Sequence, residues 1–450
     1  MKRTIKRLLL TASLFQTLCL SAGTRQPWTL EACIRHALEH NIQLKLHEQE
    51  QAAREIELHT SRNSWLPSLN AGIGQNLDFG RSPSKDGLIV DRNSANSSAS
   101  LQMNMPVFDG FRIPNDIAAR RFNLRAAVEA LNKAREDLAV GVASFFLQVL
   151  YNKEIRLIAE LQLALTTEQV RKTEALVNAG KAPASQLYDI RAQQAKDEAT
   201  LTEARNNVSL ALLDLAQSLE LEHFDSDFDI SAPATADPVA ELAAGLLPPE
   251  HIYQSAVVLK PQIKEQEYLL ESQKKVLKTA QSGYYPKLTL NASYGNGYYR
   301  YAGSEDLVNI PFGDQLRQNE RKTVGLTLTI PIFNRFEVRN SVRSARVAIL
   351  NRELMMENAK KVLYKEIQQA YFNATAAQEQ YIASAKAVEA GREAFTCAEE
   401  RYSAGKSSVF EYGEAKTKYA QSLSQQAQAK YNFIFRAKIL DFYNGRPITL

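Results

Sequence analysis

One residue pair in the sequence has the spacing of a metal site, His36 and His40. Histidines four residues apart on a helix present both imidazole rings on one face, where they can bind a metal ion together. No third ligand accompanies them, although His47 follows two turns later. We therefore expect packed or solvated histidines and no metal site.

The other residue types that perform catalysis show no catalytic spacing. Serine, histidine and aspartate residues form neither a nucleophile elbow nor a glycine-rich phosphate loop. After the first two dozen residues only two cysteines remain, Cys33 and Cys397, too few for a disulfide framework. We expect no enzyme and no bound cofactor.

Two glutamates, Glu411 and Glu414, lie three residues apart in the first turns of the last predicted helix. Their side chains project from one face of that helix. Carboxylates at a helix N-terminus are favoured by the helix dipole, and this local role alone would explain the pair. Any further role depends on what the helix faces.

The first residues are set aside before the fold is considered. Four basic residues precede the apolar stretch 8–20, and small residues follow, which is typical of a secretory signal peptide over residues 1–23. Lipidation at Cys19 is the alternative, but Thr17 and Leu18 precede it where small residues are expected. Without four of its 54 basic residues the chain has 50 against 50 acidic ones, so its charge is no argument for nucleic-acid binding.

The remaining chain contains an internal duplication. The segment around Pro67 recurs around Pro286, and the segment around Gly180 recurs around Gly405. The first pair is 219 residues apart and the second 225, so the halves differ by one length change of six residues. A repeat of this length indicates two copies of one structural unit.

The duplication defines the expected domains. Residues 24–221 form the first repeat and 250–450 the second, and the irregular segment 222–249 connects them. The length change falls between the strands of each half, so 78–96 and 297–322 are expected to be loops.

Each repeat contains one pair of predicted strands, at about 66–108 and about 286–333. Segments of about ten residues alternate between small polar and apolar residues, and this period of two predicts strands. Aromatic residues such as Trp65 and Phe333 flank them. The pattern is typical of transmembrane β-barrel strands. The alternative is two soluble hairpins beneath a helical core.

Each repeat also contains one very long helix, about 112–178 and about 337–402, with shorter helices before the strands and after the long helix. The long stretches are almost free of proline and glycine and rich in strong helix formers. Roughly 65 residues rise about 100 Å, too long for a compact domain. We expect a strut in which a long helix packs beside two short helices stacked end to end, with strands at one end.

Four strands cannot close a membrane barrel, whose smallest bacterial form has about eight. Unpaired strand edges are not tolerated in lipid. If the strands span a membrane, the chain must oligomerise, and the residues alone allow dimers and larger assemblies.

The order and spacing of these elements resemble the TolC-like outer-membrane efflux protein family. The resemblance covers essentially the whole mature chain, including the duplication. It is carried by the helix entry Trp28-Thr29-Leu30-Glu31-Ala32-Cys33, the strand entries Pro67 and Pro286, the segments Pro106-Val107-Phe108 and Pro331-Ile332-Phe333 before the long helices, and Arg401-Tyr402-Ser403-Ala404-Gly405-Lys406 at the second helix tip.

The resemblance implies a mainly α fold with a small transmembrane β part. Duplicated long-helix hairpins would form a periplasmic α-barrel, and three chains of four strands would form a 12-stranded outer-membrane β-barrel. The protein would be the passive exit duct of a tripartite efflux pump or type I secretion system in a Gram-negative type envelope. Its partners would be two further copies, outer-membrane lipid, a periplasmic adaptor (membrane fusion) protein and an inner-membrane transporter.

A structural periplasmic coiled-coil protein, or an adaptor with soluble hairpins, is the alternative. An adaptor should have lipoyl-like β-rich halves around one helical hairpin. This sequence predicts two hairpins and no such halves.

The resemblance also implies roles for individual residues. Glu411, Glu414 and Tyr402 match residues of the periplasmic gate, where three copies of the glutamates would form a cation-attracting, pH-sensitive ring. Glutamate stands here where aspartate is more familiar, and the first repeat has Gln186 at the position matching Glu411. Tyr402 could equally be a helix-surface aromatic that packs on a neighbour.

The two helix-terminating turns have a local explanation and an implied function. Glycine after a helix adopts the left-handed conformation that ends it. In the family these turns form the tip that the adaptor contacts, and a small turn would also allow a partner hairpin to approach closely. The implied contact residues are Asn178, Gly180, Lys181, Ala404, Gly405 and Lys406.

Overall fold

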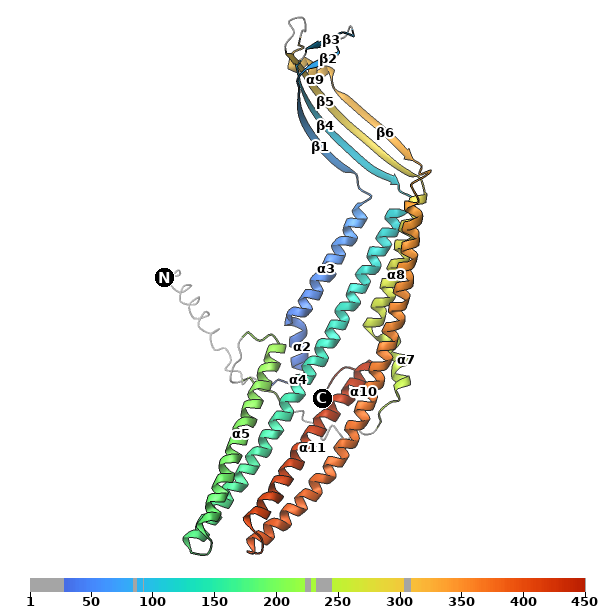
Figure 1. Cartoon of the computed structure of the whole chain (residues 1–450). Helices are drawn as coiled ribbons and strands as arrows, with labels where there is room; N and C mark the ends of the chain where they lie inside the picture. Colours follow the sequence, from blue (N-terminus) through green and yellow to red (C-terminus); the bar gives the residue numbers. More distant parts are fainter. Residues whose placement is uncertain are drawn as a thin grey trace, which may run out of the picture.

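In a computed structural model, the chain forms a long rod. A β-sheet lies at one end of the rod, and the tips of two helical hairpins lie at the other (Figure 1). The structure describes residues 28–83, 87–91, 93–222, 228–231, 245–302 and 309–449. The predicted signal peptide and most of the predicted connector therefore lie outside the described residues.

The predicted strands form one antiparallel sheet in the order β1-β4-β5-β6. The middle pair joins the two repeats, with Ala99 of β4 opposite Asn296 of β5. Apolar side chains on the outer strands are exposed, for example Ile73 at 91% and Val324 at 77%. The strands are β1 (Ser68–Asp78), β4 (Asn93–Phe108), β5 (Lys287–Ala302) and β6 (Arg321–Thr329).

The expected loops 78–96 and 297–322 are only partly loops. Strands β4 and β5 each have 16 residues and extend into both segments, where Asn93 pairs with Ala302. These extensions are rich in serine, asparagine, glycine and tyrosine, and they lack the alternation of polar and apolar residues. They are strands because β4 of the first repeat pairs with β5 of the second. The same two segments contain the small hairpin β2 (Arg81–Pro83) and β3 (Ile89–Asp91) and the short helix α9 (Phe312–Gln318).

Most of the remaining described residues are helical. In the first repeat they are α2 (Leu30–His40), α3 (Ile42–Asn63), α4 (Arg112–Asn178) and α5 (Ala184–Ser218). In the second they are α7 (Pro249–Leu259), α8 (Pro261–Gln281), the 3-10 turn η1 (Ser282–Tyr284), α10 (Glu337–Ser403) and α11 (Val409–Tyr443). Among these described helices, none is long and apolar enough to cross a lipid bilayer.

The first helix of each repeat is broken where a continuous helix was expected. Asn41 has φ −59° and ψ 129°, and its side chain accepts a hydrogen bond from the Leu44 amide at 3.1 Å, so it ends α2 and caps α3. Lys260 occupies the matching position before Pro261, which disfavours helical geometry in the preceding residue. Lys260 is buried with its ammonium 3.1 Å from Glu136, and burial lowers its pKa.

Both long helices begin at a phenylalanine with a left-handed backbone, Phe111 at φ 66° and Phe336 at φ 61°. Gly110 precedes the first of them at φ 69°. A Cβ on Gly110 would lie 2.6 Å from the Ser282 carbonyl oxygen, so this turn requires glycine for space as well as conformation.

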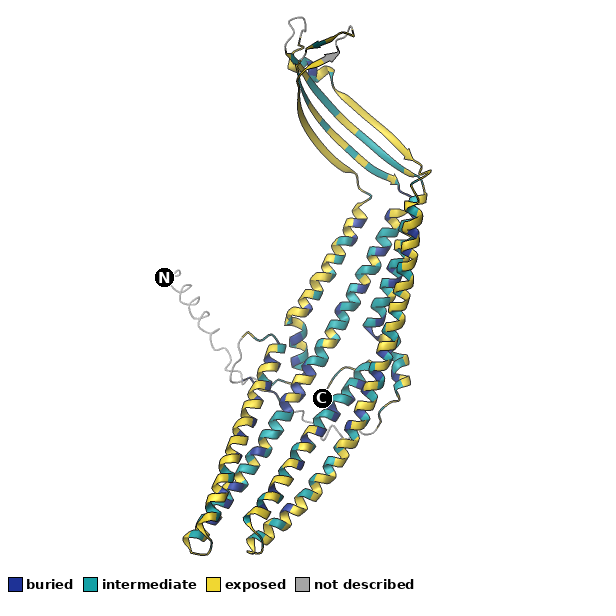
Figure 2. Ribbon diagram, viewed as in Figure 1, coloured by how far each residue is buried: buried dark blue, intermediate teal, exposed yellow. Residues whose placement is uncertain are grey.

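The main apolar core lies midway along the rod, where α2, both hairpins and residues 228–230 meet (Figure 2). Cys33, Val142, Phe146, Leu215 and Phe433 are at most 1% exposed there. Nearer the sheet, α8 of the second repeat packs between α4 and α10, and Ser272 donates a hydrogen bond to the Ala119 carbonyl of α4 at 3.1 Å. The repeats are thus packed into one unit.

The two described cysteines differ in accessibility. Both are unpaired; Cys33 is buried and Cys397 is exposed. Burial raises the pKa of the Cys33 thiol to about 12, so its thiolate is scarce at neutral pH. We expect a maleimide to label Cys397 in the native protein and to reach Cys33 only after denaturation. Rapid labelling of Cys33 in a native C397S variant would contradict the burial of Cys33 in the core.

Candidate functional site

The two hairpins end in turns of the same geometry at the end of the rod remote from the sheet (Figure 1). The amide of Gly180 donates to the Val177 carbonyl at 2.9 Å, and that of Lys181 donates to Leu176 at 2.8 Å. Gly405 and Lys406 repeat both bonds with Tyr402 and Arg401. These paired bonds form the Schellman closure of a helix C-terminus.

The turn glycines are required for conformation and not for space. Both have φ 70°, and a Cβ on either would meet no other atom within 4 Å. The surface around the turns is therefore open. The six residues predicted at these tips are all exposed: Asn178, Gly180, Lys181, Ala404, Gly405 and Lys406.

Glu411 and Glu414 lie on the exposed surface of the first turns of α11. The Glu411 amide donates to the N-cap Ser408 hydroxyl at 3.2 Å, which starts the helix. Glu414 pairs with Lys418, one turn further on, at 2.7 Å. Lys418 was not among the predicted site residues, although its spacing of four residues from Glu414 is a sequence signal for an ion pair.

Tyr402 is half-buried and packs against neighbours. Its ring centroid lies 5.2 Å from that of Tyr412, and its hydroxyl is 3.4 Å from the Thr173 hydroxyl of α4. Desolvation, and to a lesser degree Glu399, raises the pKa of Tyr412 to about 12. In the structure, therefore, Tyr402 links the second hairpin to α4.

The structure does not join Tyr402 to the predicted gate carboxylates. Among the described residues, Tyr402 makes no hydrogen bond to Glu411 or Glu414. The ring that packs on it, Tyr412, belongs to the second hairpin, and Phe395 packs in turn on Tyr412 and Tyr419.

A buried ion pair holds α11 against the first hairpin. The Lys416 ammonium lies 2.7 Å from the Asp197 carboxylate of α5, and both side chains are at most 5% exposed. Thr166 of α4 bonds to both groups. Gln193 donates to the second carboxylate oxygen at 2.7 Å. Lys416 is two residues after Glu414, so this network positions the helix that carries the glutamates.

Each hairpin has apolar packing of its own in this lower part of the rod. Ala159, Leu201 and Ala204 pack between α4 and α5, and Phe395 packs on Tyr412 between α10 and α11. Polar groups also join the two hairpins near the tips: Lys416 contacts Asp197 and Thr166, and Tyr402 contacts Thr173. A cleft of about 570 Å³ opens at this joint between α4, α5 and α11, with Glu414 and Lys418 in its lining.

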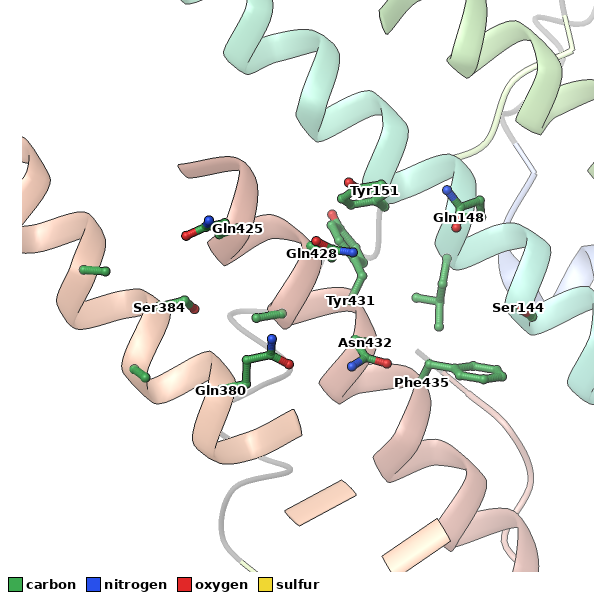
Figure 3. A pocket seen from close by; sticks show the side chains of 14 residues that line it. Ser144, Gln148, Tyr151, Gln380, Ser384, Gln425, Gln428, Tyr431, Asn432 and Phe435 are labelled. Atoms are coloured by element: carbon green, nitrogen blue, oxygen red, sulfur yellow. The ribbon is translucent and has the colours of Figure 1, made fainter. Parts of the chain in front are cut away.

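A second, larger hollow of about 810 Å³ lies further from the tips, between α4, α10 and α11 (Figure 3). Its lining contains no charged side chain and is rich in amides, among them Gln148, Gln380 and Gln425. Gln425 is 14 residues after Glu411, and a repeat of seven keeps side chains on nearly the same helix face. One face of α11 thus changes from charged near the tip to neutral and polar higher up.

The predicted histidine pair is packed. The rings of His36 and His40 stack with centroids 4.1 Å apart, and Trp28 meets His36 edge-on at 5.1 Å. His40 Nδ1 lies 3.0 Å from the His36 carbonyl oxygen. Within the described residues no group of three potential ligands gathers around a common point.

The chain matches known proteins along most of its length. The family model described as outer membrane efflux protein matches residues 33–220 and 252–441. The outer membrane protein TolC of Salmonella enteritidis is 22% identical over 393 residues, which is 84% of this chain and 74% of that protein. The pyoverdine export outer membrane protein OpmQ of Pseudomonas aeruginosa is 27% identical over 76% of this chain and 69% of its own.

Solved structures share the fold at low sequence identity. The crystal structure of CusC, a channel-forming membrane protein, superimposes with a TM-score of 0.76 at 17% identity and covers 96% of both chains. The outer-membrane channel OprN gives a TM-score of 0.73 at 18% identity, covering 93% of this chain and 90% of its own.

Proposed function

Because the chain belongs to the outer membrane efflux protein family, we propose that three copies assemble into the exit duct of a tripartite efflux pump. The protein is an outer-membrane efflux channel that spans the periplasm of a Gram-negative envelope. Its family is one of transport ducts and not of enzymes. The proposal has four parts: the trimer, its gate, its docking surface and the absence of catalysis in this chain.

The open edges of the sheet are the observation that best supports the trimer. In the described chain β1 pairs only with β4, and β6 only with β5. Exposed apolar residues such as Ile73 and Val324 would face lipid, where unpaired backbone groups are not tolerated. Pairing β6 of one copy with β1 of the next would close the sheet, and three copies would supply 12 strands.

The tips are proposed as the surface that a periplasmic adaptor protein contacts. They are exposed, have glycine at the turns, and are alike in both hairpins. Channels of this family act with periplasmic adaptors and inner-membrane transporters. The near-equal tips would offer an adaptor two similar sites per chain.

The gate is proposed to be formed by the face of α11 that carries Glu411 and Glu414. Three copies would bring six carboxylates and three Lys418 ammonium groups to the narrow end of the duct. Per chain, two negative charges and one positive leave −1, so the ring would carry −3. The amide-rich face higher on α11 would line the wider, neutral part of the duct.

Cross-linking tests the assembly directly. We expect purified protein in detergent, treated with an amine-reactive cross-linker, to give a ladder that stops at three chains. Boiling should convert a compact, heat-modifiable band from outer-membrane fractions into the monomer. A stable monomer in detergent that keeps its strands would contradict the trimer. A ladder that stops at two or at four chains would contradict the proposed number of three chains.

A further inference from the structure

We propose that a basic pocket at the junction of the sheet and the helices binds the phosphate headgroup of an anionic glycerophospholipid. The proposal takes the four strands as the membrane-spanning part of the channel and adds a lipid site beside them. The pocket is lined by residues from the end of α8 and from the first turns of α10. Both helices meet the sheet at this level (Figure 1).

Three arginines on one face of α10 form the pocket wall. Arg339, Arg343 and Arg346 follow one another at intervals of four and three residues, so successive side chains are neighbours on the helix surface. Tyr284 and Tyr285 also line this open hollow, whose volume is about 690 Å³. A hollow of this size is within the usual range for small-ligand sites and can hold a lipid headgroup.

The three arginines lack a carboxylate partner within the described residues. No ion pair of Arg339, Arg343 or Arg346 occurs in the described part of the chain, and Glu337 at the start of the same helix pairs with none of them. Three like charges gathered without a counterion repel one another, and a phosphate would relieve that repulsion. Arginine also matches phosphate geometry with paired hydrogen bonds.

The first repeat provides an internal comparison. The positions 225 residues earlier are Pro114, Ala118 and Arg121, so two of the three arginines are unique to the second repeat. Near the start of α4, moreover, Arg112 pairs with Asp109 at 3.4 Å and Arg120 with Glu57 at 2.9 Å. Among its described residues, the first repeat therefore has no such unpaired arginine cluster at the start of its long helix, although it has the same fold there.

Aromatic residues around the pocket favour a lipid over a soluble anion. Tyr284 and Tyr285 are 55% and 50% exposed, and Phe333 and Phe336 are 72% and 54% exposed. The Arg339 guanidinium lies 5.5 Å from the Phe336 ring centre. Exposed rings concentrate where proteins cross the membrane–water interface, and basic pockets at that level recognise anionic headgroups.

The test uses the full chain, assembled and purified in a neutral detergent. Short-chain phosphatidylglycerol, short-chain phosphatidylcholine and inorganic phosphate are titrated separately, and binding is followed by native mass spectrometry for the lipids and calorimetry for phosphate. Each basic residue near a membrane surface contributes about fivefold to anionic lipid affinity. We expect R339Q/R343Q/R346Q to bind phosphatidylglycerol about 100-fold more weakly, and R343Q alone about fivefold more weakly.

A matched variant controls for loss of charge. K360Q/K365Q/K386Q removes three positive charges from α10 further from the sheet and should leave lipid binding unchanged. Equal affinity of the wild type for the two lipids would overturn the proposal, as would equal losses in the two triple variants. Inorganic phosphate binding as tightly as phosphatidylglycerol would show a soluble-anion site and overturn it too. The oligomeric state of the same samples separates failure of this site from failure of the channel assembly.

Discussion

Replacing Lys416 with methionine is expected to lower the free energy of unfolding of the helical hairpins by about 3–5 kcal/mol. The substitution leaves the Asp197 carboxylate buried without its cation, in a network where Thr166 and Gln193 cannot neutralise it. Thermal or denaturant unfolding, followed by circular dichroism at 222 nm on the assembled protein, measures the loss.

A neighbouring ion pair on the same helix is the control. Lys418 and Glu414 are 2.7 Å apart, but their side chains are 70% and 51% exposed. Exposed pairs of this kind contribute at most about 1 kcal/mol, so K418M should change stability little. Equal losses in K416M and K418M would show that water reaches Asp197 and would contradict its burial.

The double variant K416M/D197L separates the charge from the packing. Replacing a buried pair with apolar residues of similar size is often neutral or stabilising, because no charge then needs to be desolvated. We expect the double variant to recover most of the stability lost in K416M. A double variant as unstable as the sum of two severe single variants would mean that the space at this joint tolerates no apolar packing.

The second large effect is expected at the proposed gate. In E411Q/E414Q the carboxylates are gone and Lys418 remains, so the charge on the ring changes from −3 to +3 in the trimer. Rings of charged side chains set the ion preference of a pore. The reversal potential in a salt gradient across a planar bilayer should therefore move from cation preference to none or to anion preference.

Two further measurements sharpen the gate experiment. Block by trivalent cations from the periplasmic side should weaken in E411Q/E414Q, because the carboxylates that would bridge them are absent. K418Q should shift selectivity the other way, since six carboxylates would then act without a counterion. Unchanged selectivity in a correctly assembled E411Q/E414Q channel would place both glutamates on an outer, solvated face and leave the exit duct itself unaffected.

The elements of this fold were predictable because their signals are local. The proline-free stretch of strong helix formers ends at Gly180 in one repeat and at Gly405 in the other, and both glycines adopt the left-handed turn expected of them. The alternation around Val324 and Leu326 gave a strand in the same way. The prediction of one continuous helix before the first strand was wrong for a reason that is also local. The helix breaks at Asn41, whose side chain caps the helix that follows it.

The candidate site was predictable only in part. The tip residues and Glu411 and Glu414 lie exposed at the hairpin ends, and their roles in adaptor contact and gating stay predictions. Tyr402, however, packs within its own hairpin and against Thr173 of α4. The contact with Thr173 depends on the position of α4, and the gate role of Tyr402 stays a prediction.

By itself, the sequence determined the duplication, the long helices, the alternating strands and the turns, because each depends on residues close together in the chain. Tertiary structure alone decided that Lys416 meets Asp197, 219 residues away, and that β4 pairs with β5 across the repeats. It also left Arg339, Arg343 and Arg346 without carboxylate partners in the described chain. The physical reason is that a buried charge is stable only beside its counter-charge, and no periodicity along one helix specifies which distant helix will supply it.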